Sequence, residues 1–266
     1  AGDGVPMAEL TGKVALVTGA SKGIGRAIAS RLAAEGCDIA LVSRDAEVLS
    51  AAAGEMAASH GVRAVAIAVD LASEAGCNDA AGKALAAFGG IDILVNCAGD
   101  TKAGVFPAQP DADWTSGFAL KFFGAVRLTR ALWVPLKARR GTVINIGGAA
   151  AYTPSPGFMV GGAANAALAH FTKSLSKQGL VDDVNVNIIH PGATVTERME
   201  TLVRQEAAAE GIPEEEIRRR NRERAGIRRL GTPEDIAEAV AFLCLPRARH
   251  IQGVGIAIDG GATPGL

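Results

Sequence analysis

The chain has 266 residues, of which 48% are hydrophobic and 21% are charged, a balance that suits a soluble domain with a large core. Its 27 basic and 28 acidic residues nearly cancel, which argues against a nucleic-acid-binding protein. The stretch 141–172 lacks Asp, Glu, Lys and Arg, but its prolines and glycines argue against a membrane span.

In chain order, short β-branched runs alternate with segments of helical spacing. Strands are predicted at 13–19, 38–44, 62–70, 91–99, 141–147, 184–192 and 254–261. Helices are predicted at 23–36, 46–60, 74–88, 113–138, 161–178 and 232–243. This alternation predicts a single α/β domain over residues 7–266, doubly wound, with a parallel sheet of about seven strands and helices on both faces.

The segment 195–229 interrupts this alternation, and its second half, from Pro213 to Arg229, is densely charged. It is interpreted as a helical insertion. One reading is a solvated excursion, and the other is a mobile substrate lid, because the segment leaves directly from a strand end.

No signal peptide is expected, and residues 1–6, which precede Met7, are interpreted as a cloning remnant. The scattered cysteines form no Cys-x-x-Cys pair and indicate reduced thiols, no metal site and a cytoplasmic protein. They are Cys37, Cys77, Cys97 and Cys244.

The first strand runs into a glycine-rich turn, TGASKGIG, from Thr18 to Gly25. Glycines at 19, 23 and 25 allow a tight turn and a close approach to a diphosphate. The helix that follows offers amide donors and the positive end of its dipole. Because the turn lies between a strand and a helix, it predicts a dinucleotide site.

The Gly-x-x-x-Gly-x-Gly spacing resembles that of the short-chain dehydrogenase/reductase family. Further resemblances, in family order, are NCAG at Asn96–Gly99, HPG at His190–Gly192, the run from Arg229 to Leu243, and DGG at Asp259–Gly261. The resemblance implies a Rossmann-type fold and hydride transfer between a nicotinamide cofactor and a small carbonyl or alcohol substrate. It also implies a homotetramer or homodimer.

The second predicted strand ends in Ser43 and Arg44, where a hydrogen-bond donor and a guanidinium suit the 2′-phosphate of NADP(H) rather than NAD(H). Lys22 adds a second charge. The alternative is that Arg44 stacks on adenine while Asp45 binds the ribose. The cofactor set implied by the resemblance is Gly19, Ser21, Lys22, Gly23, Ile24, Gly25, Ser43, Arg44, Asp70, Leu71, Asn96, Ala98, Gly99, Asn165, Pro191, Gly192, Thr194 and Thr196.

In the resembling family an Asn, a Ser, a Tyr and a Lys hold the substrate oxygen and transfer its proton. Here the four matching positions hold Lys121, Gly148, Gly161 and Asn165. The register is firm, because the chain has one tyrosine, Tyr152, which lies nine residues before the family position.

Lys121 is the preferred replacement, since it interrupts an apolar helical stripe and burial would lower its pKa. The alternative is a lysine that contacts only cofactor, backbone or solvent. Tyr152 reaches the site from its loop or anchors that loop, and His190 either titrates there or is structural.

Three functions follow from these residues. The preferred one is an NADP(H)-dependent oxidoreductase with a non-standard proton donor. The others are a cofactor-binding protein without hydride chemistry, acting as a sensor or regulatory subunit, and a non-redox enzyme that uses the vacated pocket. Aromatic and sulfur side chains hint at an apolar substrate pocket or belong to the core, namely Phe118, Phe122, Phe158 and Met159.

Overall fold

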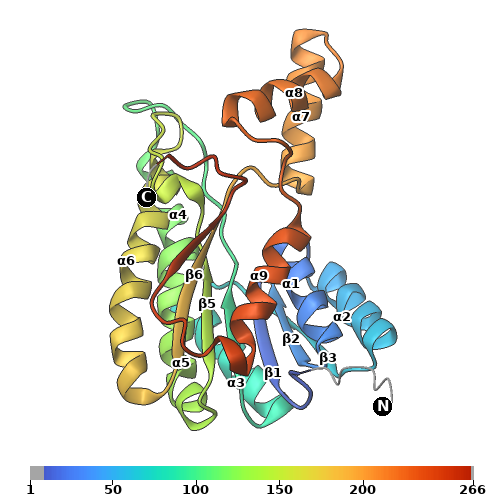
Figure 1. Cartoon of the computed structure of the whole chain (residues 1–266), viewed down its shortest axis with the longest axis vertical. Coiled ribbons are helices and arrows are strands. Elements are labelled where there is room, and N and C mark those ends of the chain that lie inside the picture. Colours follow the sequence, from blue (N-terminus) through green and yellow to red (C-terminus); the bar gives the residue numbers. More distant parts are fainter. Residues whose placement is uncertain (1–8, 265–266) are drawn as a thin grey trace.

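The structure is a computed structural model and describes residues 9–264. At its centre a single sheet of parallel strands runs in the order β3-β2-β1-β4-β5-β6-β7 (Figure 1). The strands are β1 (Val14–Thr18), β2 (Asp38–Ser43), β3 (Ala64–Ala68), β4 (Ile93–Asn96), β5 (Thr142–Ile146), β6 (Asn185–Pro191) and β7 (Gly255–Ile258). The predicted doubly wound parallel sheet is therefore confirmed. The interpretation of residues 1–6 lies outside the described residues.

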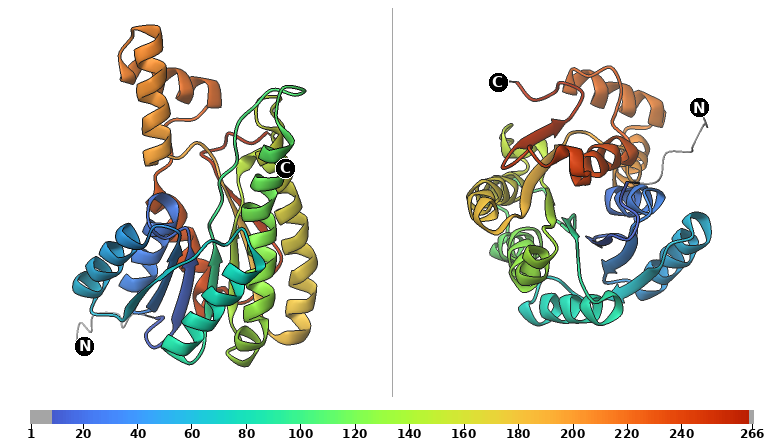
Figure 2. Two further views of the ribbon diagram at one scale, coloured as in Figure 1. Left: turned by 180° about the vertical axis from the view of Figure 1, so that it is seen from behind. Right: turned by 60° about the horizontal axis from the view of Figure 1, so that its bottom comes forward.

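Helices cover both faces of the sheet (Figure 2). One layer holds α1 (Gly23–Ala34), α2 (Ala46–His60) and α9 (Pro233–Cys244), and the other holds α3 (Glu74–Phe88), α4 (Asp111–Phe118), α5 (Ala125–Ala138) and α6 (Met159–Asp182). Each layer buries an aliphatic face against the strands, with Leu32 and Leu49 in the first core and Leu128 and Leu136 in the second. Strands that are apolar on both faces are the reason for this arrangement.

The helix predicted at 113–138 is broken by a π-helical segment, Ala119–Gly124. A Cβ at Gly124 would come within 2.9 Å of Leu71 O, so the helix approaches the end of β3 unusually closely there. A π-helical turn accommodates one extra residue and shifts the direction of the side chains that follow. Lys121 lies inside this segment, which the sequence periodicity did not predict.

The predicted insertion forms α7 (Glu197–Glu210) and α8 (Glu214–Ala225), together called the arm, which stands out from the body (Figures 1 and 2). The arm has a small core of its own in Val203, Ala207 and Ile217. Arg218 joins its helices through Glu200 at 2.5 Å and also bonds Glu214 at 2.8 Å. The arm is thus internally packed, although its surface is charged.

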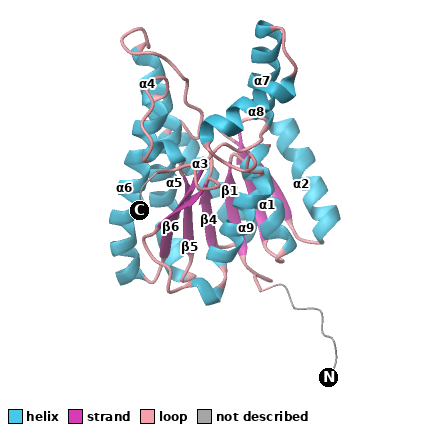
Figure 3. Ribbon diagram, turned by 45° about the horizontal axis from the view of Figure 1, so that its top comes forward, coloured by secondary structure: helices cyan, strands magenta, loops and turns pink. Residues whose placement is uncertain are grey.

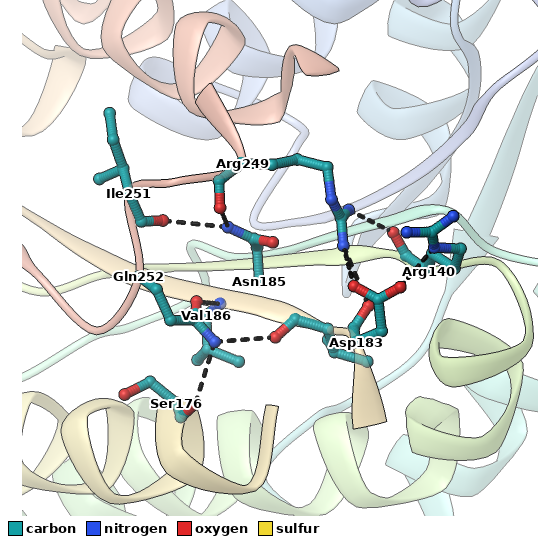
Figure 4. Close-up of polar contacts among 9 residues, drawn as sticks. Arg140, Ser176, Asp183, Asn185, Val186, Arg249, Ile251 and Gln252 are labelled. Carbon is teal, nitrogen blue, oxygen red and sulfur yellow. Dashed lines mark hydrogen bonds and ion pairs between the residues drawn. The ribbon is translucent and has the colours of Figure 1, made fainter. Parts of the chain in front are cut away.

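A polar network closes the amino-terminal edge of the sheet (Figure 4). Arg249 donates to Arg140 O at 2.7 Å and to Asp183 Oδ1 at 2.6 Å. Arg140 and Asp183 both have positive φ, at 52° and 57°, and the guanidinium holds their turns together. Asn185 donates to Arg249 O at 2.9 Å, which ties the start of β6 to the same network.

The opposite, carboxyl edge of the sheet is open. The strand order reverses between β1 and β4, and this is where ligands bind in open parallel sheets. Figure 3 shows the arm and the loop that leads into α4 standing on opposite sides of this edge.

Candidate functional site

A cleft of about 1300 Å³ lies at the carboxyl ends of β1, β2, β4, β5 and β6. One end is lined by the glycine-rich turn and by Ser43 and Arg44. The other end is lined by Lys121, Asn165 and Phe158. The cleft therefore joins the predicted cofactor site to the region where the resembling family has its catalytic side chains.

The glycine-rich turn packs directly on the end of β4. Gly19 has φ of +66°, and a Cβ there would lie 3.2 Å from Ala98 backbone atoms. Thr18 Oγ1 accepts hydrogen bonds from the amides of Cys97 and Ala98, both at 2.9 Å. α1 begins at Gly23 with no side-chain cap from Lys22. Its first amides therefore remain available for an anion such as a diphosphate.

The end of β2 carries an unsatisfied hydrogen-bonding group. Ser43 Oγ is buried and has no hydrogen-bond partner within residues 9–264. In the same part of the chain neither Arg44 nor Lys22 forms an ion pair. The Asp45 carboxylate accepts from Val48 N at 3.1 Å and so caps α2. A cleft lined by an unpaired hydroxyl and by two cations without ion pairs fits a phosphate group, and Asp45 already has a structural partner.

Most of the predicted cofactor residues line this cleft. They are Gly19, Ser21, Lys22, Ile24, Gly25, Ser43, Arg44, Leu71, Ala98, Gly99, Asn165, Pro191, Gly192, Thr194 and Thr196. Gly23 lines an adjoining hollow beside the arm. Asp70 is exposed and accepts from Ala72 N at 3.0 Å. Asn96 is buried and donates to Thr129 Oγ1 and Asn145 Oδ1. Cofactor contacts of these three residues stay predictions.

Lys121 reaches from the π-helical segment to the carboxyl end of β5. Its Nζ donates to Ile146 O at 2.7 Å and to Gly147 O at 3.4 Å. The side chain lies against Gly99, where a Cβ would crowd Lys121 Cδ. Burial lowers the pKa of the Lys121 ammonium. Backbone carbonyls thus hold the lysine in the cleft, and its ammonium gives up a proton more readily than that of an exposed lysine.

Asn165 and Gly148 face each other beside the same strand end. A Cβ at Gly148 would lie 2.8 Å from Asn165 Nδ2, so the amide occupies the space left by the absent side chain. Asn165 is 7% exposed, and its Oδ1 has no hydrogen-bond partner within residues 9–264. A buried acceptor that lacks a donor in the protein points to a ligand donor.

Phe158 fills the space at the tyrosine position. A Cβ at Gly161 would overlap Phe158 Cε1 and Cζ. Phe158 precedes α6, and backbone bonds from its amide to Ser155 O and from Gly162 to its carbonyl, at 3.1 and 2.9 Å, hold it there. The cleft is therefore lined by an aromatic ring at this point. Of the four residues proposed for an apolar pocket, Phe158 alone is in this lining.

Tyr152 and His190 bond each other outside this lining. His190 Nδ1 lies 3.1 Å from Gly148 O, which can only accept, so Nδ1 carries the proton. Nε2 then accepts from the Tyr152 hydroxyl at 3.2 Å. Burial lowers the pKa of His190 and keeps it neutral. Tyr152 anchors its loop, and His190 holds the chain after β5.

These features were compared with known proteins. Residues 13–207 match the family described as short chain dehydrogenase. This chain belongs to that family. A 3-oxoacyl-(acyl-carrier-protein) reductase of Aquifex aeolicus is 35% identical, covering 95% of this chain and 98% of that protein. A 2,3-dihydro-2,3-dihydroxybenzoate dehydrogenase of Bacillus subtilis is 32% identical, covering 97% and 98%.

Solved structures agree with this assignment. The L-sorbose reductase of Gluconobacter frateurii, complexed with NADPH and L-sorbose, superposes with a TM-score of 0.94 at 33% identity, covering 98% of this chain and all of that one. A short-chain dehydrogenase of Burkholderia cenocepacia in complex with NADP has a TM-score of 0.84 at 34% identity, covering 96% and 99%. The predicted oxidoreductase class is confirmed at the level of the family.

This short-chain dehydrogenase has cleft residues that sequence reasoning missed. Arg26, Asp100 and Glu197 line the cleft with charges. Cys97 also lines it, but burial raises the pKa of its thiol to about 11, so it stays protonated at neutral pH. Each of these four residues directly follows a predicted cofactor residue in the sequence, and this position was the signal that could have identified it.

Within 9–264, no three His, Cys, Asp or Glu side chains gather to hold a metal ion. None of the helices in this range combines the length and hydropathy needed to span a membrane.

Proposed function

We propose that this short-chain dehydrogenase transfers a hydride between NADP(H) and a small carbonyl or alcohol substrate, with Lys121 as proton donor. The observation that carries the proposal is Lys121 Nζ, held at the end of β5 inside the cofactor-sized cleft. When bound, the nicotinamide would supply or accept the hydride. The chain's own residues bind the cofactor and handle the proton.

The phosphate end supports NADP(H) over NAD(H). Arg44 and Lys22 have no ion pair in the described residues, and Ser43 Oγ has no partner there. A 2′-phosphate would satisfy all three groups, whereas a ribose hydroxyl would leave both cations without an anion. The relatives solved with NADPH and NADP are consistent with this preference.

At the substrate end of the cleft, the proposed chemistry depends on the positive charge of the Lys121 ammonium. A developing alkoxide requires a proton and an electrostatic partner, and an ammonium supplies both. Burial lowers the pKa of Lys121, which makes its proton easier to give. Phe158, Gly148 and Gly161 leave no hydroxyl where the resembling family has two.

That same absence favours a second candidate, an NADP(H)-binding protein without turnover. The substrate end lacks the two hydroxyl side chains of the resembling family, whereas most of the predicted cofactor residues line the cleft. The arm is proposed to act as a substrate lid in the first case, because Thr196 and Glu197 at its base line the cleft.

We also propose a homotetramer or homodimer in the cytoplasm. Val134 on α5 and Leu180 and Val181 on α6 are more than 70% exposed, which suits a helix-to-helix contact between copies. Cysteines 37, 77, 97 and 244 are free thiols, as expected in a reducing compartment.

Two measurements test the function. Titration of NADPH and NADH, followed by nicotinamide fluorescence, should show tighter binding of NADPH. A panel of aldehydes, ketones and alcohols should then change the nicotinamide absorbance. Binding without turnover over the whole panel would replace the oxidoreductase with the second candidate, and failure to bind either nucleotide would exclude both.

A further inference from the structure

The substrate end of the cleft has an unusual set of hydrogen-bonding groups. Its donor is Lys121, and its unsatisfied acceptor is Asn165 Oδ1. The ring of Phe158 lines the same cleft and fills the space at Gly161, where the resembling family has a phenol. A reacting group that fits this site must match both its donor and its acceptor.

Lys121 offers one hydrogen bond to a substrate. An ammonium has three N–H donors, and Ile146 O and Gly147 O take two of them, at 2.7 and 3.4 Å. Gly148 and Gly161 have no side chain that could add another. A carbonyl oxygen has two lone pairs, so this site leaves one of them unpaired. An imine nitrogen has one lone pair, which a single donor satisfies.

Asn165 adds the complementary acceptor. Its Oδ1 is buried in the cleft without a donor in residues 9–264, and an amide oxygen accepts two hydrogen bonds. One can come from a ribose hydroxyl of the cofactor and the other from an N–H group. The amine product has one N–H for Asn165 Oδ1 and one lone pair for Lys121 Nζ, whereas the alcohol formed from a ketone keeps a second lone pair without a donor.

We propose that the substrate class of this site is an imine, so that the enzyme reduces C=N to an amine. The inference rests on the proposed hydride transfer and deepens it. The hydride of NADPH adds to the imine carbon and leaves NADP⁺. The π pair of the C=N bond moves to nitrogen, which takes the proton from the Lys121 ammonium. Lys121 then regains a proton from solvent, and the charges balance.

The matched pair dihydroisoquinoline, a cyclic imine, and tetralone, the ketone of the same ring skeleton, tests the assignment. NADPH oxidation by the full chain should show a kcat/KM at least about tenfold higher for the imine. With NADP⁺ present, tetrahydroisoquinoline should raise the melting temperature more than tetralol. Equal or faster reduction of tetralone overturns the inference but leaves the hydride transfer standing. Reduction of neither compound by protein with bound NADPH overturns both.

Gly148 provides a second test with a matched control. Gly148→Ser adds a hydroxyl as a second donor beside the Lys121 ammonium, and Gly148→Ala adds the same Cβ without it. Both must displace Asn165 Nδ2, so packing effects cancel in the comparison. We expect the Ser variant to lower the imine-to-ketone ratio of kcat/KM by about tenfold relative to the Ala variant. An equal ratio in the two variants contradicts the donor count on which the inference depends.

Discussion

The ring of Phe158 lies against the backbone of Gly161, in the space that any side chain at position 161 would need. The two residues are three apart at the start of α6, so one turn of chain supplies the ring and the gap it fills. The tyrosine position is thus filled by a phenyl ring from a different residue. This end of the cleft is rebuilt and packed, which a simple loss of side chains would not produce.

This relationship makes Gly161→Ala destabilising. Alanine ordinarily stabilises a helix interior relative to glycine by about 1 kcal/mol. Here the new Cβ overlaps the Phe158 ring, and such overpacking costs about 1–3 kcal/mol. Urea unfolding should show a net loss of stability. Gly54→Ala on α2, where a Cβ meets nothing within 4 Å, should show a gain. Equal gains in the two variants would mean that Phe158 moves freely.

Much of the architecture was predictable, because each strand is a short apolar run that ends at a glycine or a polar residue. The helices at 46–60 and 74–88 were predicted to the residue, since Asp45 and Ser73 cap them and Gly61 and Gly89 end them. These capping signals depend only on neighbouring residues, so the helix ends can be predicted from the sequence alone.

The packed site was less predictable. Lys121, Gly148 and Asn165 line the same cleft, but no local sequence pattern predicted the π-helical segment. It depends on the close approach of Gly124 to Leu71, which are far apart in sequence. The occupancy of the Gly161 space by Phe158 likewise depends on tertiary packing. Neither the π-helical segment nor the position of the Phe158 ring can therefore be predicted from sequence periodicity alone.

We expect the activity to fall at alkaline pH, because it depends on the protonated form of Lys121. Burial lowers the pKa of its ammonium, which is the form that donates the proton. Activity is therefore present below that pKa and is lost as the pH rises through it, below the usual value of about 10.4. Lys121→Ala should abolish this alkaline fall in the pH profile of activity and lower kcat about 100-fold or more. Lys102→Ala, an exposed lysine in the loop before α4, is the control. If Lys121→Ala keeps the same alkaline fall in activity, that fall belongs to another titrating group.

Arg44 should determine the choice of nucleotide. Its guanidinium is exposed at the end of β2 beside the unsatisfied Ser43 hydroxyl. Removing one charge-assisted bond to a phosphate costs about tenfold in affinity. Arg44→Ala should raise the Kd of NADPH by about that factor and leave NADH nearly unchanged in fluorescence titrations. Lys83→Ala on α3, whose partner is Asp79, should change neither. A parallel loss for both nucleotides would indicate adenine stacking instead.

Asp182 should make stability sensitive to acid. Its carboxylate accepts from Lys137, Trp133 and Gln178, at 2.5, 2.9 and 2.8 Å. These donors, the Lys137 bond first, lower its pKa to about 2, compared with about 3.9 in an unfolded chain. The contribution is present above the unfolded value and is lost as the pH falls towards the folded one.

Asp182→Asn should therefore lose stability at neutral pH and flatten the decline in unfolding temperature between about pH 4 and pH 2. Asp79→Asn, which removes an exposed pair with Lys83, should leave that decline in place. The measurement is thermal unfolding at constant ionic strength. If the slopes of Asp182→Asn and the parent chain coincide, the α5–α6 contact does not control acid unfolding.

Gln252 should be essential to the closed edge of the sheet (Figure 4). Its Nε2 donates to Ser176 O and Val184 O, at 2.9 and 3.0 Å, and its Oε1 accepts from Val186 N at 2.7 Å. Gln252→Glu keeps the shape but sets a carboxylate against two carbonyl oxygens. The expected loss is about 2–4 kcal/mol in urea unfolding at neutral pH. The loss should shrink at lower pH, because a protonated carboxyl can again donate to one of the two carbonyls. Gln109→Glu, in the exposed loop before α4, should change stability by less than about 1 kcal/mol. A loss at Gln252 no larger than this would show that solvent reaches the edge and replaces its bonds.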